Sequence, residues 1–269
     1  MATTASGTGY ALVTGASAGI GQAIAREYAR RGKRLILTAR RADRLQALAA
    51  ELGRQVACEV IVADLADPAA PAQLHAETVA RGLHVDTLVN NAGYGVPGAY
   101  LSSDWHTHAQ FLQVMVTAVA DLTHGFAPAM REAGHGRILN IASLAGLVPA
   151  SAGHTLYGAS KALMIRFSEC LALELRPHGV HVTALCPGFT WSEFHDVNGM
   201  RQSISQLPRW LWMDADAVAR AGINAVERGD LRHVPGSINR VIAGLCKLLP
   251  EAAARALVGG KADAFRDAG

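Results

Sequence analysis

The chain has 269 residues, of which half are hydrophobic and 17% are charged, and its formal net charge is +3. This length and composition provide for a substantial buried core in one large domain or two small ones. The densest basic cluster, Arg30 to Arg34, is typical of a helix end followed by a solvated turn. The charge distribution therefore argues against nucleic-acid binding, and no nucleic-acid partner is expected.

The sequence carries no sign of secretion, membrane insertion or metal binding. Its four cysteines are Cys58, Cys170, Cys186 and Cys246. They lie far apart and form no CxxC pair, so we expect buried free thiols in a reducing compartment. Residues 1–9 lack the pattern of a secretory signal, and no apolar stretch reaches the roughly 18 residues of a spanning helix. We therefore expect a cytoplasmic protein without a metal site.

Short apolar runs alternate with longer amphipathic ones along the chain. The expected buried strands are Tyr10–Thr14, Arg34–Thr38, Val56–Val62, Thr87–Asn90, Arg137–Ile141 and Val180–Leu185. The expected helices cover about 20–31, 41–52, 68–80, 103–131, 155–176 and 214–229. Near-continuous apolar strands between helices predict an α/β fold, a doubly wound parallel sheet of the Rossmann type with helices on both faces. We expect one domain over 1–269, with ligands at the carboxyl ends of the strands.

A glycine-rich turn follows the first strand, in the order Thr14-Gly15-Ala16-Ser17-Ala18-Gly19-Ile20-Gly21. The spacing is GxxxGxG rather than GxGxxG, but the physical needs are the same. The turn is tight, the backbone must approach a pyrophosphate, and the following helix offers free N–H groups and the positive end of its dipole. Many βα turns use glycine. The position after the first strand nevertheless favours nucleotide binding over an ordinary turn.

The second strand ends in Leu37-Thr38-Ala39-Arg40-Arg41, where an acidic residue would accept hydrogen bonds from the ribose 2′-hydroxyl of NAD. Two arginines stand there instead, and a guanidinium can hold a 2′-phosphate through charge-assisted hydrogen bonds. The alternative is that both are solvent-exposed charges beside the next helix. We expect NADP(H) to be favoured over NAD(H), with Arg40 the stronger contact because it lies nearer the strand end.

Tyr157 and Lys161 lie four residues apart in a predicted helix, so they share one face. A tyrosine has a reference pKa of about 10, and a neighbouring positive charge favours the phenolate. The pair would make Tyr157 a general acid or base for alcohol and ketone chemistry. Alone, this spacing is more often an ordinary helical face. Its position downstream of Ser143 and of the glycine-rich turn favours catalysis.

Together these motifs resemble the short-chain dehydrogenase/reductase family over about residues 10–195. The matching segments, in the family's order, are the glycine-rich turn, Asp64-Leu65, Asn90-Asn91-Ala92-Gly93, Ser143, Tyr157-Gly158-Ala159-Ser160-Lys161 and Cys186-Pro187-Gly188. Any one of them is weak evidence, whereas the ordered set is specific. The resemblance implies a pyridine-nucleotide oxidoreductase.

The resemblance also implies a role for each matching residue. The expected cofactor-binding residues are Gly15, Ser17, Gly19, Ile20, Gly21, Arg40, Arg41, Asp64, Leu65, Asn91, Ala92, Gly93, Tyr157, Lys161, Pro187, Gly188, Phe189 and Thr190. Asp64 and Leu65 would border the adenine, although Asp64 is equally a helix cap. The segment 90–93 would line the adenosine ribose, although asparagines there also form turns. Residues 187–190 would shape the loop around the nicotinamide.

For catalysis, the resemblance implies that Ser143 orients the substrate oxygen, Tyr157 exchanges the proton, and Lys161 lowers the pKa of Tyr157 and binds the nicotinamide ribose. A serine at a strand end is otherwise commonly a cap or turn residue. One position departs from the family. Met115 stands where an asparagine usually lies in a kinked fourth helix and holds a water for proton relay. Gln113 is the nearest polar substitute; alternatively, Met115 merely fills a gap in the packing.

The expected substrate pocket is lined by Tyr94, His154, Trp191 and Phe194. Apolar and aromatic residues are dense over about 189–213, which fits a lid over the active site, a local packing cluster or an oligomer contact. The tail at about 237–258 is predicted to be an amphipathic helix with too few basic residues for strong membrane-surface contact. The family resemblance implies a homodimer or homotetramer through the fourth and fifth helices.

We therefore expect an NADP(H)-dependent enzyme that interconverts a small hydrophobic ketone and its alcohol. A dinucleotide-binding sensor or scaffold with weak catalysis is the alternative. Met115 supports that alternative, and the intact set of Ser143, Tyr157 and Lys161 opposes it. A sugar-nucleotide epimerase is disfavoured because the chain lacks a substantial extra C-terminal domain.

Overall fold

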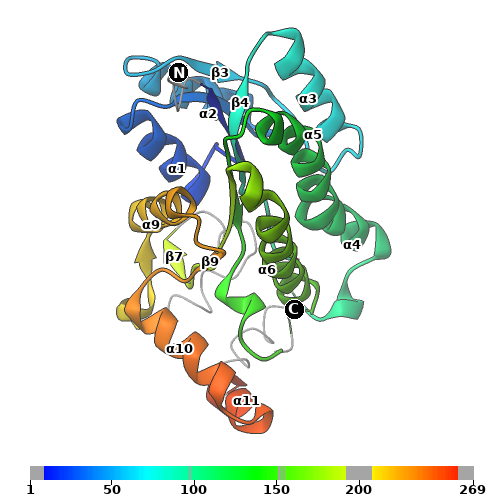
Figure 1. Ribbon diagram of the computed structural model, residues 1–269. Coiled ribbons are helices and arrows are strands. Elements are labelled where there is room, and N and C mark those ends of the chain that lie inside the picture. The colour runs from blue at the N-terminus through cyan, green and yellow to red at the C-terminus, as the bar shows by residue number, and fades with distance from the viewer. Residues whose placement is uncertain (1–8, 97, 151–152, 154, 192–207, 260–269) are drawn as a thin grey trace.

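A seven-stranded parallel sheet forms the centre of the molecule in the computed structural model, which describes residues 9–96, 98–150, 153, 155–191 and 208–259 (Figure 1). Its strands are β1 (Tyr10–Thr14), β2 (Arg34–Thr38), β3 (Cys58–Val60), β4 (Val85–Asn90), β5 (Gly136–Ile141), β6 (Val180–Leu185) and β9 (Arg232–His233). They lie in the order β3-β2-β1-β4-β5-β6-β9. The order reverses between β1 and β4, which is where open α/β sheets bind their ligands. The predicted α/β fold is confirmed.

Helices cover both faces of the sheet. They are α1 (Gly19–Arg30), α2 (Ala42–Leu52), α3 (Ala70–Ala80), α4 (Trp105–Leu112), α5 (Ala118–Glu132), α6 (Thr155–Leu175), α9 (Ala215–Arg228), α10 (Ser237–Leu248) and α11 (Glu251–Gly259). Helices α1, α2 and α9 pack on one face through one apolar cluster, whereas α3, α5 and α6 pack on the other through a second. Helices α10 and α11 project at the end of the molecule away from α2 and α3 (Figure 1).

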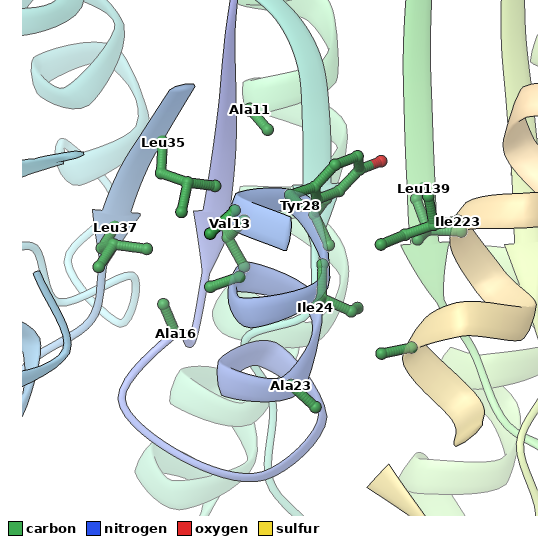
Figure 2. Close-up of a cluster of buried hydrophobic side chains, with 14 of the residues drawn as sticks. Ala11, Val13, Ala16, Ala23, Ile24, Tyr28, Leu35, Leu37, Leu139 and Ile223 are labelled. Atoms are coloured by element: carbon green, nitrogen blue, oxygen red, sulfur yellow. The ribbon is translucent and has the colours of Figure 1, made fainter. Parts of the chain in front are cut away.

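Successive residues of β1 enter opposite cores, because side chains alternate across a strand. Ala11 and Val13 join the cluster under α1, and Leu12 joins the cluster on the other face. Figure 2 shows Val13 close to Ile24 and Tyr28 of α1. Because both faces of the sheet are covered, the strand is apolar throughout, which is the pattern that made it recognisable in the sequence.

The strand predictions differ from the structure mainly at the sheet edges. The expected strand Val56–Val62 is shortened to β3, an edge strand that pairs only with β2 among the described strands. Strand β4 begins two residues earlier than expected, because the buried charge of Asp86 interrupts the apolar pattern. Lys33 neutralises Asp86 through an ion pair. The short edge strand β9 is not predicted at all.

Two expected helices are interrupted. The predicted helix 103–131 is divided into α4 and α5 by a π-helical segment, Gln113–Thr117. The predicted tail helix 237–258 is instead two helices, α10 and α11. Leu249 between them is extended, at φ −77° and ψ 148°, because the following Pro250 disfavours a helical conformation there.

The four cysteines are free thiols, as expected, but only Cys186 is buried. Cys170 is exposed because it lies on the outer face of α6, so the expectation of four buried thiols is wrong. Within the described part of the chain, no helix is long and apolar enough to cross a membrane.

Candidate active site

The glycine-rich turn packs directly against the segment after β4. Gly15 has a φ of +66°, a conformation that favours glycine. A Cβ atom on Gly21 would lie 2.3 Å from Nδ2 of Asn91 and 2.4 Å from the carbonyl oxygen of Gly15. That Nδ2 atom donates to the carbonyl oxygens of Thr14, at 2.9 Å, and Gly15, at 3.2 Å. The structure therefore brings together Gly15, Gly21 and Asn91, three of the residues predicted to bind the cofactor.

Thr14 joins the same two segments and was not singled out as a site residue. Its hydroxyl donates to the carbonyl oxygen of Val89 at 3.1 Å and accepts from the backbone N–H groups of Asn91 and Ala92 at 3.0 and 3.1 Å. The side chain is 1% exposed. The signal in the sequence was a threonine that ends a buried strand whose preceding residues, Ala11 to Val13, are apolar.

The start of α1 fits a phosphate group. Its N-cap residue, Ala18, forms no side-chain cap, and the first turn contains no acidic residue. The first N–H groups of the helix are therefore not satisfied by a side-chain cap, and the positive end of the helix dipole attracts an anion. Gly19, with a φ of +55°, and the half-buried Ile20 belong to this start. These features fit the pyrophosphate of a dinucleotide, which would lie along the turn.

Arg41 brings a positive charge to this turn. Its Nε and Nη2 atoms donate to Oγ of Ser17 at 3.2 and 3.0 Å. Ser17 is 7% exposed, so its hydroxyl is fixed in place. Arg40 is exposed, and its charge acts on Tyr94: burial raises the pKa of Tyr94, and Arg40 opposes that shift. Arg41 is therefore the arginine in direct contact with the glycine-rich turn.

The residues expected at the adenine lie beside Arg40. Leu65 is 7% exposed and belongs to the apolar core. Asp64 is exposed, and its Oδ1 atom accepts from the backbone N–H of Ala66 at 3.0 Å, so it also forms the local turn that was its alternative role. The Tyr94 ring lies edge-on to Phe111 at 5.7 Å. Burial raises the pKa of Tyr94, and the charges of Arg40 and Asp64 both act on it, so Tyr94 lies near these two residues.

Ser143, Tyr157 and Lys161 meet where β5 and α6 approach each other. Ser143 caps a short 3₁₀ turn, accepting from the N–H of Ala145 at 3.1 Å, and its side chain is hydrogen-bonded to Tyr157. The Nζ atom of Lys161 donates to the carbonyl oxygen of Ile141 at 2.7 Å and lies 5.7 Å from the centroid of the Tyr157 ring. Ser143 and Lys161 therefore both lie beside the phenol of Tyr157.

Burial dominates the ionisation of this group. It raises the pKa of Tyr157 to about 12, while the hydrogen bond with Ser143 acts in the opposite direction. Burial also lowers the pKa of Lys161 to about 8, and the Cys186 side chain opposes that shift. A lowered pKa was expected for Tyr157 because of Lys161, and in the protein without cofactor this expectation is wrong. Desolvation of the phenolate raises the pKa by more than the hydrogen bond with Ser143 lowers it. At neutral pH the phenol is protonated and the amine is mostly charged.

Gly146 allows this close approach and was missed. A Cβ atom there would lie 2.7 Å from the backbone nitrogen of Ala162 and 2.7 Å from the carbonyl carbon of Lys161. A larger residue would push the Ser143 turn away from α6. The only signal in the sequence was a glycine three residues after Ser143, and its packing partner on α6 is known only from the fold.

Asn239 on α10, which was not predicted as a site residue, packs against the loop after β6. The carbonyl oxygen of Pro187 accepts from the N–H of Leu144 at 2.9 Å, which places this loop beside the Ser143 turn. A Cβ atom on Gly188 would lie 2.5 Å from Oδ1 of Asn239 on α10. Asn239 is 4% exposed and donates to the carbonyl oxygen of Pro235 at 3.0 Å. Helix α10 therefore packs directly on the loop expected around the nicotinamide.

The two ends of the expected lid lie together. Strands β7 (Thr190–Trp191) and β8 (Met213–Asp214) pair in parallel, and Met213 donates its N–H to Phe189 at 2.9 Å. The rings of Trp191 and Trp212 stack at 4.2 Å, and Phe189 lies 5.5 Å from Trp212. These contacts form an aromatic cluster of Phe189, Trp191 and Trp212, where the two ends of the expected lid meet. Phe194 and His154, two residues of the expected pocket, lie outside the described residues.

Tyr157 also lines a pocket between the start of α6 and helix α4, and we refer to it as the α4 pocket. It is a shallow hollow, and the figure of about 270 Å³ for the space between its walls includes open solvent at its mouth. Its lining residues are Val96, Gly98, Ala99, Tyr100, His108, Phe111, Thr155, Leu156 and Tyr157. The segment after β4, helix α4 and the start of α6 contribute to it. The pocket is thus next to the residue expected to exchange the proton.

Met115 lies in the middle of the π-helical segment and is 1% exposed. A Cβ atom on Gly93 would lie 2.8 Å from its Sδ atom, so the thioether fills the space beside Gly93. Nε2 of Gln113, the nearest polar substitute, is buried without a hydrogen-bond partner in the described part of the chain. The methionine therefore fills a packing gap within the π-helical segment.

Comparison with known proteins shows a match to the family described as short chain dehydrogenase over residues 9–201. Sulfoacetaldehyde reductase 2 of Chromohalobacter salexigens is 38% identical over 188 residues, which are 68% of this chain and 73% of that protein. The NADP-dependent 3-hydroxy acid dehydrogenase YdfG of Salmonella typhi is 35% identical over 235 residues, 80% of this chain and 92% of that protein.

Solved structures are similar over most of the chain. A short-chain dehydrogenase from Sphingobium yanoikuyae, in complex with NADPH, has a TM-score of 0.79 and 32% identity, covering 91% of this chain and 97% of that one. A bulky-bulky ketone specific alcohol dehydrogenase from Comamonas testosteroni has a TM-score of 0.74 and 30% identity, covering 91% and 96%. Both likenesses extend well beyond the glycine-rich turn, over the sheet and its helices.

Proposed function

This chain belongs to the short-chain dehydrogenase/reductase family, whose members are NAD(P)-dependent oxidoreductases, and on that premise we propose that it interconverts a hydrophobic ketone and its secondary alcohol with NADP(H). The observation that carries the proposal is the placement of the Tyr157 phenol between Ser143 and Lys161, beside a pocket. Tyr157 is the acid in the direction of reduction and the base in the direction of oxidation.

Each residue of the site has a separate role in the proposed reaction. The bound cofactor supplies or accepts the hydride. Ser143 orients the substrate oxygen towards Tyr157, and its hydroxyl helps to stabilise the charge that develops there. With a pKa of about 12, Tyr157 is protonated at neutral pH and donates its proton to that oxygen. Lys161, still mostly charged at pH 7 with a pKa of about 8, faces the phenolate that results.

The residues at the glycine-rich turn support NADP(H) as the favoured cofactor. Arg41 donates two hydrogen bonds to Ser17, at the point where the second strand and the turn meet. A guanidinium held there can bind a 2′-phosphate through charge-assisted hydrogen bonds. The similar Sphingobium dehydrogenase was solved with NADPH, and the Salmonella relative is NADP-dependent by name.

A hydrophobic substrate is supported by the walls of the site. The α4 pocket contains Val96, Phe111 and Leu156, and the aromatic cluster of Phe189, Trp191 and Trp212 lies at the base of the segment that we propose as a lid. The similar Comamonas enzyme is specific for bulky ketones. The sensor or scaffold hypothesis has weaker support, because its one argument is Met115 within the π-helical segment, while Ser143, Tyr157 and Lys161 lie together.

The experiment that tests the function is the substitution Tyr157→Phe, with NADPH oxidation measured against steroid, acyl, aromatic and cyclic ketones. We expect loss of the acid–base contribution, roughly 10²-fold to 10⁴-fold in turnover, while NADPH binding by fluorescence stays largely intact. Tyr10→Phe on β1, far from the site in the chain and the sheet, is the matched control and should keep wild-type turnover. Turnover near the wild-type rate in Tyr157→Phe would rule out the role.

A further inference from the structure

The loop that follows β6, residues 187–190, begins beside the proposed proton donor. The carbonyl oxygen of Pro187 accepts from the N–H of Leu144 at 2.9 Å, and the preceding residue, Ser143, is hydrogen-bonded to Tyr157. A ring that passes a hydride to a carbonyl carbon must lie against the same carbonyl whose oxygen Tyr157 protonates. The nicotinamide of the cofactor would therefore lie close to this loop.

Asn239 on α10 packs its side-chain amide against the middle of the loop. A Cβ atom on Gly188 would lie 2.5 Å from Oδ1, 2.7 Å from Nδ2 and 2.8 Å from Cγ of Asn239. These three nearest atoms all belong to one side chain. Gly188 does not have a positive φ, so its backbone conformation is open to other residues. The close contact with Asn239 is therefore what requires glycine at this position.

The amide of Asn239 is itself held in one place. The residue is 4% exposed, and its Nδ2 atom donates to the carbonyl oxygen of Pro235 at 3.0 Å and to Sδ of Met213 at 3.4 Å. Met213 in turn donates its backbone N–H to the carbonyl oxygen of Phe189 at 2.9 Å. Asn239 thus contacts both the middle of the loop and the strand that holds its far end.

We propose that Asn239 is a positioning residue for the nicotinamide half of NADP(H). Its amide sets the path of residues 187–190, and this loop sets where the ring lies against the reacting carbonyl. The inference rests on the proposed function. Asn239 acts through the backbone at Gly188 and takes no part in hydride or proton transfer. The adenosine half of the cofactor belongs to the glycine-rich turn, so the two halves should respond differently to substitution of Asn239.

The test compares two ligands by isothermal titration calorimetry. One is NADPH, and the other is adenosine 2′,5′-bisphosphate, which contains the adenosine and the 2′-phosphate but no nicotinamide. For Asn239→Ala we expect the affinity for NADPH to fall roughly threefold to tenfold, the size of one neutral hydrogen bond. The affinity for the bisphosphate should stay at the wild-type value. Asn224→Ala, at an exposed asparagine on α9 that binds Arg31, is the control and should change neither affinity.

A second set of variants tests the contact from the side of the loop. Gly188→Ala places a methyl group against the Asn239 amide, so it should weaken binding of NADPH but not of the bisphosphate. Adding Asn239→Ala removes the atoms that this methyl group meets. The double variant should therefore bind NADPH more tightly than Gly188→Ala alone, since residues in contact are not additive. Gly188→Ala by itself carries the comparison of the two ligands if Asn239→Ala does not fold.

The comparison of ligands separates positioning from a general loss of structure. The inference is wrong if Asn239→Ala weakens both ligands equally or weakens neither, or if the effects of the two substitutions simply add. In those cases the proposed ketone reduction still stands. If the wild type neither binds NADPH nor reduces any of the ketones, the proposed function fails and this inference fails with it.

Discussion

Arg41 shows how one contact at the residue scale bears on cofactor choice. The sequence favoured Arg40 because it lies nearer the end of the second strand. In the structure, Arg41 is the residue that donates to Ser17 in the glycine-rich turn, whereas the charge of Arg40 acts on Tyr94. A pair of neighbouring arginines on an extended backbone points in different directions, so their order along the chain does not decide which one meets a phosphate.

We predict that Arg41→Ala weakens NADPH binding more than Arg40→Ala does. The loss should be roughly tenfold to a hundredfold, as for hydrogen bonds to a charged group, with NADH binding little changed. Arg54→Ala, at an exposed arginine beyond α2, serves as the control. Fluorescence titration with both cofactors measures the effect. A wild type that binds NADH as tightly as NADPH would contradict the proposed preference.

At the element scale, the π-helical segment Gln113–Thr117 interrupts the predicted helix 103–131 around Met115. Such segments are rare and occur frequently at functional sites. Here the segment places Met115 against Gly93, where the family usually has an asparagine. A thioether is only a weak hydrogen-bond acceptor, so it cannot hold a relay water as an amide can. Proton supply to Lys161 is therefore the step in which this chain should differ from its relatives.

We predict that Met115→Asn raises turnover where proton supply limits the rate. The gain should be roughly tenfold at most, because a relay contributes only part of acid–base catalysis. The control is Met115→Leu, which keeps the volume and adds no polar group. Turnover and its solvent isotope effect, measured across pH, provide the readout. If Met115→Asn leaves both unchanged, the missing-relay hypothesis is wrong.

At the scale of the whole molecule, an exposed apolar surface bears on assembly. Large apolar side chains are exposed to solvent before α4, on α4 and along α6. They are Leu101 before α4, Trp105 on α4, and Leu163 and Leu173 on α6. These helices are neighbours on one side of the sheet (Figure 1). Exposed apolar side chains on neighbouring helices are a feature of protein interfaces where they gather into one patch. We therefore propose a homodimer or homotetramer formed through α4 and α6, which lie within the fourth and fifth predicted helices, 103–131 and 155–176, that the family resemblance implies for this contact.

We predict that Trp105→Glu weakens this association, because it places a charge in an apolar contact. The control is Val79→Glu on α3, since Trp105 and Val79 are each 66% exposed and Val79 lies outside the proposed surface. Analytical ultracentrifugation should show a larger species for the wild type and for Val79→Glu than for Trp105→Glu. A wild-type protein that sediments as a monomer would overturn the proposal.

The sequence by itself determined the class of the fold and the family. The apolar strands, the amphipathic helices and the glycine-rich turn are local patterns, because periodicity and turn chemistry act over a few residues. They were enough to predict a doubly wound sheet and the place of its ligands. The local patterns were weakest where neighbours outside the segment decide the outcome, as at the edge strand β9 and the buried charge of Asp86.

Only the tertiary structure decided which distant residues meet. The sheet order brings Thr14 to Asn91, and the path of α10 brings Asn239 to Gly188. In the same way, Gly146 lets the Ser143 turn reach α6. These contacts join residues far apart in the chain, and no local pattern encodes them. The reaction class could therefore be inferred from sequence, whereas the positions of Arg41 and Asn239 required the fold.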